Sequence, residues 1–256
     1  MTNKLRILDP GLPCIVLPGY TSSIGRAISS LFLSSGCFTV LGLSRKPSNQ
    51  YFESKYPDSF CHVTVTSEFY FDSHAIESLF LSFPSLSGLV YLPSHSSLSA
   101  CHRLKRADFY SAFDLNVISP FMFALAFKKA VAVNSATKRA SIVFLSSVAA
   151  VRPSRGQLLY SVSKASLSAL VSNLALEFAP VNIRVNGIIA GYIESEASDR
   201  LESLVGANGI ASILSRYPLS KGLPSDLASL VYFLINSDSS WMTGSNIVLD
   251  GGFTLT

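Results

Sequence analysis

The sequence predicts an α/β protein, a single domain with a doubly wound, seven-stranded parallel sheet and helices on both faces. Short apolar runs alternate with helical periods along the 256 residues, as repeated βαβ units require. The apolar runs are continuous, which is typical of parallel strands buried on both faces. A glycine-containing turn directly follows the first run, as in sheets that bind nucleotides at their carboxyl edge.

Each expected element follows from such a run or period. The long central helix contains Pro120, which we expect to kink it. The expected strands cover residues 14–17, 38–43, 61–65, 86–92, 142–145, 182–188 and 246–250. The expected helices cover residues 24–33, 73–80, 103–133, 160–178, 195–216 and 224–235.

Length and composition favour one soluble domain spanning residues 1–256. Hydrophobic residues make up 48% of the chain and charged residues 14%, so a large core is possible, and no flexible linker divides it. The apolar segment 121–127, between Pro120 and Lys128, is too short to span a bilayer. The residues before Pro10 lack the apolar core of a signal peptide, so we expect a cytoplasmic protein without a membrane segment.

Cysteine spacing and charge indicate neither a metal site nor a nucleic-acid partner. The four cysteines are scattered and form no Cys-x-x-Cys pair. The net charge is only +4, and the basic cluster at residues 102–106 lacks interleaved aromatic residues. We therefore expect a small-molecule substrate.

The stretch from residue 140 to residue 164 carries the strongest chemical signal. An apolar run delivers Ser147 to the carboxyl end of an expected strand, where open α/β sheets bind ligands. On the helix that follows, Tyr160 and Lys164 are four residues apart and therefore share one face. A phenol beside an ammonium group is expected to be a proton donor with a lowered pKa.

The Tyr-x-x-x-Lys spacing alone is not specific, because it occurs three times. Tyr51 with Lys55 and Tyr217 with Lys221 also fit. Only Tyr160 has a serine thirteen residues upstream at the end of an expected strand. We therefore take the other two pairs as accidental.

The combination resembles the short-chain dehydrogenase/reductase family, and in particular its ketoreductases similar to 3-oxoacyl-acyl-carrier-protein reductase. The matching pieces are Ser147, Tyr160, Lys164, the strand at 183–186 and the turn at 190–191. The similarity covers nearly the whole chain. It implies a Rossmann fold and a nicotinamide dinucleotide as cofactor.

The resemblance also implies a role for each catalytic position. Tyr160 would act as the acid in reduction and as the base in oxidation. Ser147 would donate a hydrogen bond to the carbonyl, Lys164 would tune the phenol and hold the ribose, and Asn116 would relay protons through water. Without the resemblance, Asn116 would be interpreted as a helix asparagine bonded to nearby backbone.

The loop after the first strand is the expected phosphate-binding site. Backbone N–H groups at a helix N-terminus hold dinucleotide phosphates in such loops. Compared with the family pattern Thr-Gly-x-x-x-Gly-x-Gly, Ser23 replaces the middle glycine and Pro18 the threonine. A positive φ at Ser23 would cost roughly 1 kcal/mol. An ordinary helix-start turn is the alternative. The expected cofactor-binding residues here are Gly19, Ser22, Ser23, Ile24 and Gly25.

The end of the second strand favours NADP(H) over NAD(H). An NAD-selective site would place a carboxylate here, whereas the chain has Ser44 and Arg45, followed by Lys46. A solvated basic turn is the alternative. The resemblance places Thr64 at the adenine contact, where relatives have aspartate, and residues 91–94 replace the family's Asn-Asn-Ala-Gly.

The turn after the sixth strand completes the expected cofactor site. By position in the family, Ile193 and Ser195 would hold the nicotinamide carboxamide, and Ala190 replaces the usual proline. Residues 195–217 match the segment that closes over substrate in relatives, so we expect a mobile lid.

These observations predict reduction of a ketone, or oxidation of a secondary alcohol, with NADP(H). Enoyl reductases of the family space the tyrosine and lysine more widely, so a C=O substrate is favoured. An apolar or acyl-thioester substrate, polyketide-like and possibly carrier-bound, would suit the apolar residues Val148, Ala149, Leu158, Leu159 and Tyr192.

Two further expectations follow from the resemblance. Relatives assemble through two long helices, so we expect a homotetramer or a homodimer. The departures at residues 23, 64, 91–94 and 190 leave a second interpretation open. In it, the chain is a non-catalytic module that binds a dinucleotide or a protein partner.

Overall fold

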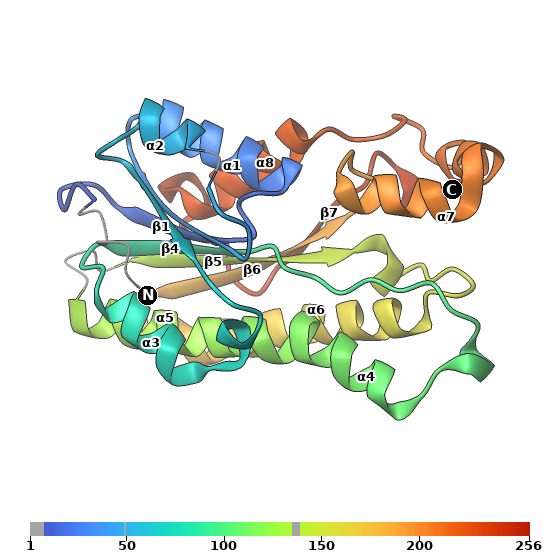
Figure 1. Cartoon of the computed structure of the whole chain (residues 1–256), viewed down its shortest axis with the longest axis horizontal. Helices are drawn as coiled ribbons and strands as arrows, with labels where there is room; N and C mark the ends of the chain where they lie inside the picture. The colour runs from blue at the N-terminus through green and yellow to red at the C-terminus, as the bar shows by residue number, and fades with distance from the viewer. Residues whose placement is uncertain (1–7, 49, 135–138) are drawn as a thin grey trace.

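The computed structural model describes residues 8–48, 50–134 and 139–256 and confirms the predicted fold class (Figure 1). Seven strands form one parallel sheet in the order β3-β2-β1-β4-β5-β6-β7. Residues 1–7, on which the expectation of no signal peptide partly depends, lie outside the described residues. The strands are β1 Cys14–Pro18, β2 Thr39–Ser44, β3 Phe60–Thr64, β4 Leu86–Tyr91, β5 Ala140–Ser147, β6 Ile183–Ala190 and β7 Asn246–Leu249.

Helices cover both faces of the sheet (Figure 1). Helices α1, α2 and α8 lie over one face, and α3, α4, α5 and α6 lie over the other. Helix α7 lies apart from these layers, near the carboxyl ends of the strands. The helices are α1 Ser23–Ser34, α2 Tyr51–Lys55, α3 Ser73–Leu81, α4 Arg106–Phe113, α5 Ser119–Asn134, α6 Leu158–Phe178, α7 Glu196–Leu214 and α8 Pro224–Ile235.

The two layers bury separate apolar cores. Along β1, Val16 faces the core that contains Phe123 and Phe127. Its neighbour Leu17 faces the core that contains Phe32. Because successive strand residues point to opposite faces, a strand between two cores must be apolar throughout, which explains the continuous runs in the sequence. Burying each such side chain contributes about 1.5–3 kcal/mol before the entropy of ordering it.

The parallel register brings the carboxyl ends of the strands to one edge. Ser44 at the end of β2 pairs with Thr64 at the end of β3. Ser147 at the end of β5 pairs with Ala190 at the end of β6. This edge is where open α/β sheets bind ligands, so the predicted site residues from distant segments come together there.

The long helix departs from the prediction in where its irregularity lies. A π-helical turn at Asp114–Ile118 joins α4 to α5, and the N–H of Ser119 donates to the carbonyl of Asp114, five residues earlier. Pro120 lacks an N–H and its ring would clash with the carbonyl four residues earlier, that of Asn116. Widening the turn before the proline relieves this clash, and the widened turn contains Asn116.

The same helical stretch corrects the prediction about membrane-spanning length. Among the described residues, the run Arg106–Asn134 is long and apolar enough to cross a bilayer, although segment 121–127 alone is short. Phe123 and Phe127 in this run are fully buried in the core beneath the sheet. Packing against the core therefore explains why this helical stretch is apolar.

Candidate active site

The structure brings three of the predicted catalytic side chains together. Strand β5 ends at Ser147, whose hydroxyl lies close enough to the Tyr160 phenol on α6 to affect its pKa. The Lys164 Nζ lies 5.7 Å from the centre of the Tyr160 ring. It also donates a 2.7 Å hydrogen bond to the carbonyl oxygen of Leu145, which fixes the amine against the end of β5.

The pKa shifts at this site differ from the prediction. Burial raises the pKa of Tyr160, and the nearby Ser147 hydroxyl only partly opposes this effect. Burial also lowers the pKa of Lys164 to about 7, because the side chain is 4% exposed. The expected lowering of the phenol pKa by the amine is therefore wrong for this structure, in which burial raises that pKa.

The Asn116 side chain acts as a hydrogen-bonding clamp, because its amide oxygen and its amide nitrogen each have two partners. Its Oδ1 accepts from the His95 N–H at 2.7 Å and from the Ser94 hydroxyl at 3.2 Å. Its Nδ2 donates to the His95 carbonyl and to the Ser163 hydroxyl, both at 2.8 Å. The side chain thereby ties the segment after β4 to α6. Its expected role in proton relay stays a prediction.

The other two Tyr-x-x-x-Lys pairs lie in different surroundings. Lys55 Nζ donates to the Tyr51 hydroxyl at 3.3 Å, but on an exposed surface. The Tyr217 hydroxyl accepts from the Tyr192 N–H at 3.1 Å, and Lys221 forms its ion pair with Glu194 instead. Tyr217 packs with Val148 just after β5, but neither pair repeats the arrangement of Ser147, Tyr160 and Lys164.

The loop after β1 has the geometry of a helix-start anion site. Gly19 has φ +83°, and a Cβ there would lie 3.2 Å from the Leu92 Cβ, so glycine is required. Ser22 caps α1, because its Oγ accepts from the Gly25 N–H at 3.1 Å. Ile24 continues the first turn. The backbone donors of this turn lie beside the sheet's carboxyl edge.

Ser23 does not incur the expected strain. Among described non-glycine residues, positive φ occurs at Gln50, Asn182 and Ser220, and Ser23 is the first residue of α1. The cost of about 1 kcal/mol that a positive φ would bring does not arise at Ser23, because the loop places this residue in helical conformation.

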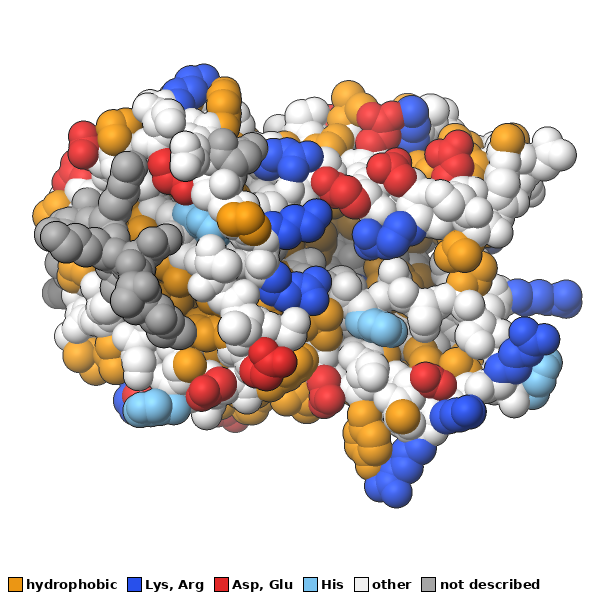
Figure 2. All heavy atoms as spheres, in the orientation of Figure 1, with side chains coloured by type: hydrophobic (Ala, Val, Ile, Leu, Met, Phe, Trp, Pro, Cys, Tyr) orange, Lys and Arg blue, Asp and Glu red, His pale blue; other side chains and the backbone are white. Residues whose placement is uncertain are grey.

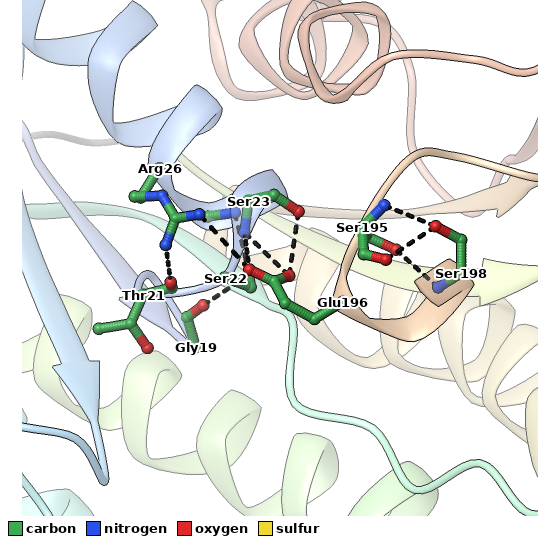
Figure 3. A network of polar contacts seen from close by, with 9 residues as sticks. Gly19, Thr21, Ser22, Ser23, Arg26, Ser195, Glu196 and Ser198 are labelled. Atoms are coloured by element: carbon green, nitrogen blue, oxygen red, sulfur yellow. Dashed lines mark hydrogen bonds and ion pairs between the residues drawn. The ribbon is translucent and has the colours of Figure 1, made fainter. Parts of the chain in front are cut away.

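Glu196 is a residue of this site that the sequence did not reveal (Figure 3). The Ser23 N–H donates to its Oε1 at 2.9 Å and to its Oε2 at 3.1 Å, and the Ser23 hydroxyl donates to Oε2 at 3.0 Å. The Arg26 Nη2 lies 3.4 Å from Glu196 Oε1. Partial burial opposes ionisation, but hydrogen bonds from its own backbone and from Ser23, with the Arg26 charge, hold the Glu196 pKa below its ordinary value. Only the fold brings residues 173 positions apart into contact, so no local pattern signals the pair.

The end of β2 combines a buried hydroxyl with exposed basic side chains. Ser44 is 2% exposed, and its Oγ donates to the Lys46 carbonyl at 2.5 Å and lies 3.3 Å from His62 Nε2. Arg45 is exposed, and so is Thr64 on the neighbouring strand. Figure 2 shows basic side chains gathered around a hollow in the middle of one face. The hydrogen bond of Ser44 fixes the turn that carries Arg45.

The two remaining predicted cofactor residues, Ile193 and Ser195, lie in the segment after β6. Ile193 is buried and forms a bridge with Gly222. Ser195 caps α7, because its Oγ accepts from the Ser198 N–H at 3.3 Å, and it also donates to the Ile193 carbonyl at 3.2 Å. In this structure both residues therefore shape the start of α7.

Only some of the apolar residues that are expected to face the substrate line a cavity in the structure. Ala149 and Leu158 line an open cavity of about 1000 Å³, together with residues of the 98–103 segment. Val148 and Leu159 are buried and do not line this cavity. Val148 packs with Ile189, Tyr217 and Phe253 instead.

A doubly wound parallel sheet with a hydroxyl, a phenol and an amine at its carboxyl edge defines a class of dinucleotide-dependent oxidoreductases. The family described as "Enoyl-(Acyl carrier protein) reductase" matches residues 19–254. The chain belongs to the short-chain dehydrogenase/reductase family. This membership supports an enzyme that acts on CH–OH and C=O groups.

Individual relatives differ in substrate and cofactor. The chain is 26% identical to 3-oxoacyl-[acyl-carrier-protein] reductase FabG of Rickettsia felis over 245 residues, which cover 94% of this chain and 96% of the relative. A structure of 4-hydroxyisoleucine dehydrogenase complexed with NADH is 29% identical, with a TM-score of 0.83 and coverage of 95% and 99%. A putative 2-deoxy-D-gluconate 3-dehydrogenase from Agrobacterium tumefaciens with bound NADP, 21% identical, has a TM-score of 0.84 with coverage of 95% and 97% and shows the shared fold.

Proposed function

We propose that the protein is an NADP(H)-dependent oxidoreductase that interconverts a ketone and a secondary alcohol. The observation that carries the proposal is the position of Ser147 beside the Tyr160 phenol at the end of β5, with Lys164 Nζ 5.7 Å from the centre of the phenol ring. A hydroxyl that can donate a hydrogen bond and a protonated phenol at one point are what carbonyl protonation needs.

The residues at the carboxyl edge of the sheet fit a nicotinamide dinucleotide. The N-terminus of α1 already binds a carboxylate, so its donors suit a phosphate. Exposed Arg45 supports NADP(H), because a guanidinium pairs with a 2′-phosphate and the neighbouring Ser44 does not repel it. When bound, the dinucleotide supplies or accepts the hydride.

Side chains of the protein supply the proton that reduction of the carbonyl requires. Ser147 donates a hydrogen bond to the carbonyl oxygen, and Tyr160 donates its proton to the same oxygen as negative charge develops there. A tyrosine with ordinary pKa is about 3 units from neutral pH, or roughly 4 kcal/mol. Because burial raises the pKa of Tyr160 further, the phenol is protonated at neutral pH and ready for reduction. In oxidation the protonated form of Lys164, whose pKa is about 7, favours the phenolate.

The substrate we propose is an apolar ketone or an acyl thioester. The four-residue spacing of Tyr160 and Lys164 favours a C=O over a C=C substrate, and several curated relatives are named 3-oxoacyl-[acyl-carrier-protein] reductases. An acidic carrier could dock on a basic surface, but Lys128 lies over the Phe178 ring and Lys129 pairs with Glu77. These two lysines are engaged, so we do not assign carrier docking to them.

A non-catalytic dinucleotide-binding or protein-interaction module is the second candidate function. It is favoured by the Glu196 carboxylate, which lies on the donors of the α1 N-terminus. The enzyme is preferred, because the four catalytic positions Asn116, Ser147, Tyr160 and Lys164 are all retained and three of them lie together.

Two measurements on the full chain test the proposal. Fluorescence titration with NADPH and with NADH reports cofactor binding, and absorbance at 340 nm with a panel of ketones reports turnover. We expect NADPH binding and NADPH-dependent loss of absorbance with at least one apolar ketone. Binding without turnover on any ketone would favour the non-catalytic module, and binding of neither dinucleotide would contradict the proposal.

We also propose a cytoplasmic homo-oligomer, a tetramer or a dimer. Exposed apolar side chains on the two long helices support this assembly, since Val133 on α5 is 66% exposed and Leu176 on α6 is 78% exposed. Light scattering coupled to size exclusion would give the mass, and a monomer would contradict this part of the proposal.

A further inference from the structure

The Glu196 carboxylate lies on the donors that a dinucleotide phosphate requires. Three hydrogen bonds from Ser23, two of them from its backbone N–H, end on the two carboxylate oxygens (Figure 3). Arg26 adds a positive charge at 3.4 Å. A negative group at the first turn of a helix is stabilised by the helix dipole, and this is the same interaction that holds phosphates.

The two anions compete for the same place. The Ser23 N–H can align well with one acceptor group at a time. A carboxylate and a phosphate side by side would also repel each other, because both are negative. A phosphate can therefore occupy the α1 N-terminus only after Glu196 has moved away.

Ser23 strengthens the contact with a group that glycine lacks. The Ser23 hydroxyl donates to Glu196 Oε2 at 3.0 Å, and a glycine at this position would provide only the backbone N–H. The departure from the glycine pattern at residue 23 and the acidic residue at position 196 are thus parts of one interaction.

Helix α7 can move and break the Ser23–Glu196 contact at a low cost in free energy. Of its residues, Ser198 and Ile210 are buried, and most of the others are exposed. Gly206 interrupts the helix with φ +71° and ψ +173°, and its surroundings are open. An element with few buried contacts moves readily.

From this geometry we infer that Glu196 is an internal competitor of the dinucleotide phosphate and holds α7 as a latch over the cofactor site. The inference rests on the proposed function. It predicts that binding of the cofactor breaks the Ser23–Glu196 contact and frees α7. The apparent affinity for the cofactor is then reduced by the fraction of molecules in which the latch is closed.

Dinucleotide titrations on four forms of the full chain test the latch. They are the wild type, Glu196→Gln, Ser23→Gly and the double variant, with Glu194→Gln as the matched control. Glu194 is a neighbouring exposed carboxylate that pairs with Lys221 instead. NADPH fluorescence gives the Kd, and amide hydrogen exchange of residues 196–214 gives a readout that is independent of turnover.

We expect Glu196→Gln to tighten NADPH binding by about tenfold, and Ser23→Gly to tighten it less. In the double variant the gains should be less than multiplicative, because both substitutions remove the same contact. Exchange in α7 should be faster in Glu196→Gln, and in the wild type after NADPH is added. Glu194→Gln should leave the Kd unchanged.

The outcomes separate this inference from the proposed function. NADPH binding by the wild type, with an unchanged or weaker affinity in Glu196→Gln, overturns the latch and leaves the proposed function standing. Failure of every form to bind NADPH or NADH overturns the proposed function and the latch with it.

Discussion

Lys164 and Tyr160 show how burial sets the chemistry of single residues in this protein. The Lys164 ammonium is removed from water and donates to the Leu145 carbonyl, and its pKa falls to about 7. The Tyr160 pKa rises for the same reason, since the charged form of each group is the one that burial disfavours. Both groups therefore approach their neutral forms near physiological pH.

Burial of Lys164 makes the stability of the protein depend on pH. Between pH 7 and about 8.5 the unfolded chain keeps the lysine proton, whereas the folded chain loses it, so stability rises with pH. Relative to Lys164→Met, the free energy of unfolding of the wild type should rise by about 1–2 kcal/mol over this range. Urea unfolding at several pH values measures the difference between the two proteins. A difference independent of pH would show that the amine titrates as in water.

Asn116 should matter for stability as well as for catalysis. It is 1% exposed and makes four hydrogen bonds with Ser94, His95 and Ser163. Asn116→Ala would remove the bonds to buried Ser163 and to half-buried His95, and should lower the free energy of unfolding by about 1–3 kcal/mol.

Asn173→Ala is the matched control for that prediction. Asn173 is an exposed helix asparagine bonded to the Ala169 carbonyl, so its loss should change the free energy of unfolding by less than about 0.5 kcal/mol. Equal effects of the two substitutions in urea unfolding would contradict the clamp assigned to Asn116.

Among the elements, α7 and the long helix differ most from simple helices. Their irregularities have different causes, since the π-helical turn at 114–118 precedes Pro120, whereas the break in α7 is at Gly206. Pro120 signals the first place in the sequence, whereas the helix expected over residues 195–216 is predicted without a break. The proline does not specify the form of the irregularity, because a proline clash can be relieved by a bend or by a wider turn.

The break at Gly206 should resist substitution. Its φ of +71° with ψ of +173° lies in a region that only glycine adopts readily, although the space around it is open. Gly206→Ala should therefore destabilise α7 by about 1–3 kcal/mol, seen as faster amide hydrogen exchange in residues 196–214. Ser203→Ala, an exposed position of the same helix, serves as the control. Unchanged exchange in Gly206→Ala would show that the backbone can relax without cost.

For the whole molecule, the sequence predicts the sheet, most of its helices and the meeting of Ser147, Tyr160 and Lys164, but not α2. It does so because continuous apolar runs and a fixed spacing depend on local chain geometry. It does not predict the contact of Glu196 with Ser23, because that pair depends on how α7 packs over the sheet edge. The sequence also does not predict the directions of the pKa shifts of Tyr160 and Lys164, because these depend on burial.

The charge around the cofactor site should decide cofactor choice. Arg45 is exposed at the end of β2, where a 2′-phosphate would lie in the proposed complex. Arg45→Ala should weaken NADPH binding by about tenfold and leave NADH binding nearly unchanged, because NADH lacks this phosphate. Parallel fluorescence titrations with the two dinucleotides measure this. Equal weakening for both would contradict a role in phosphate selection.

The most direct test of the central claim is the turnover of Tyr160→Phe with NADPH and an active ketone. The substitution removes one hydroxyl, so we predict that kcat falls by about 10²–10⁴-fold while NADPH binding persists. Tyr51→Phe, which alters the exposed tyrosine of another Tyr-x-x-x-Lys pair, should keep full activity. Wild-type turnover in Tyr160→Phe would contradict the assignment of the phenol as the proton donor.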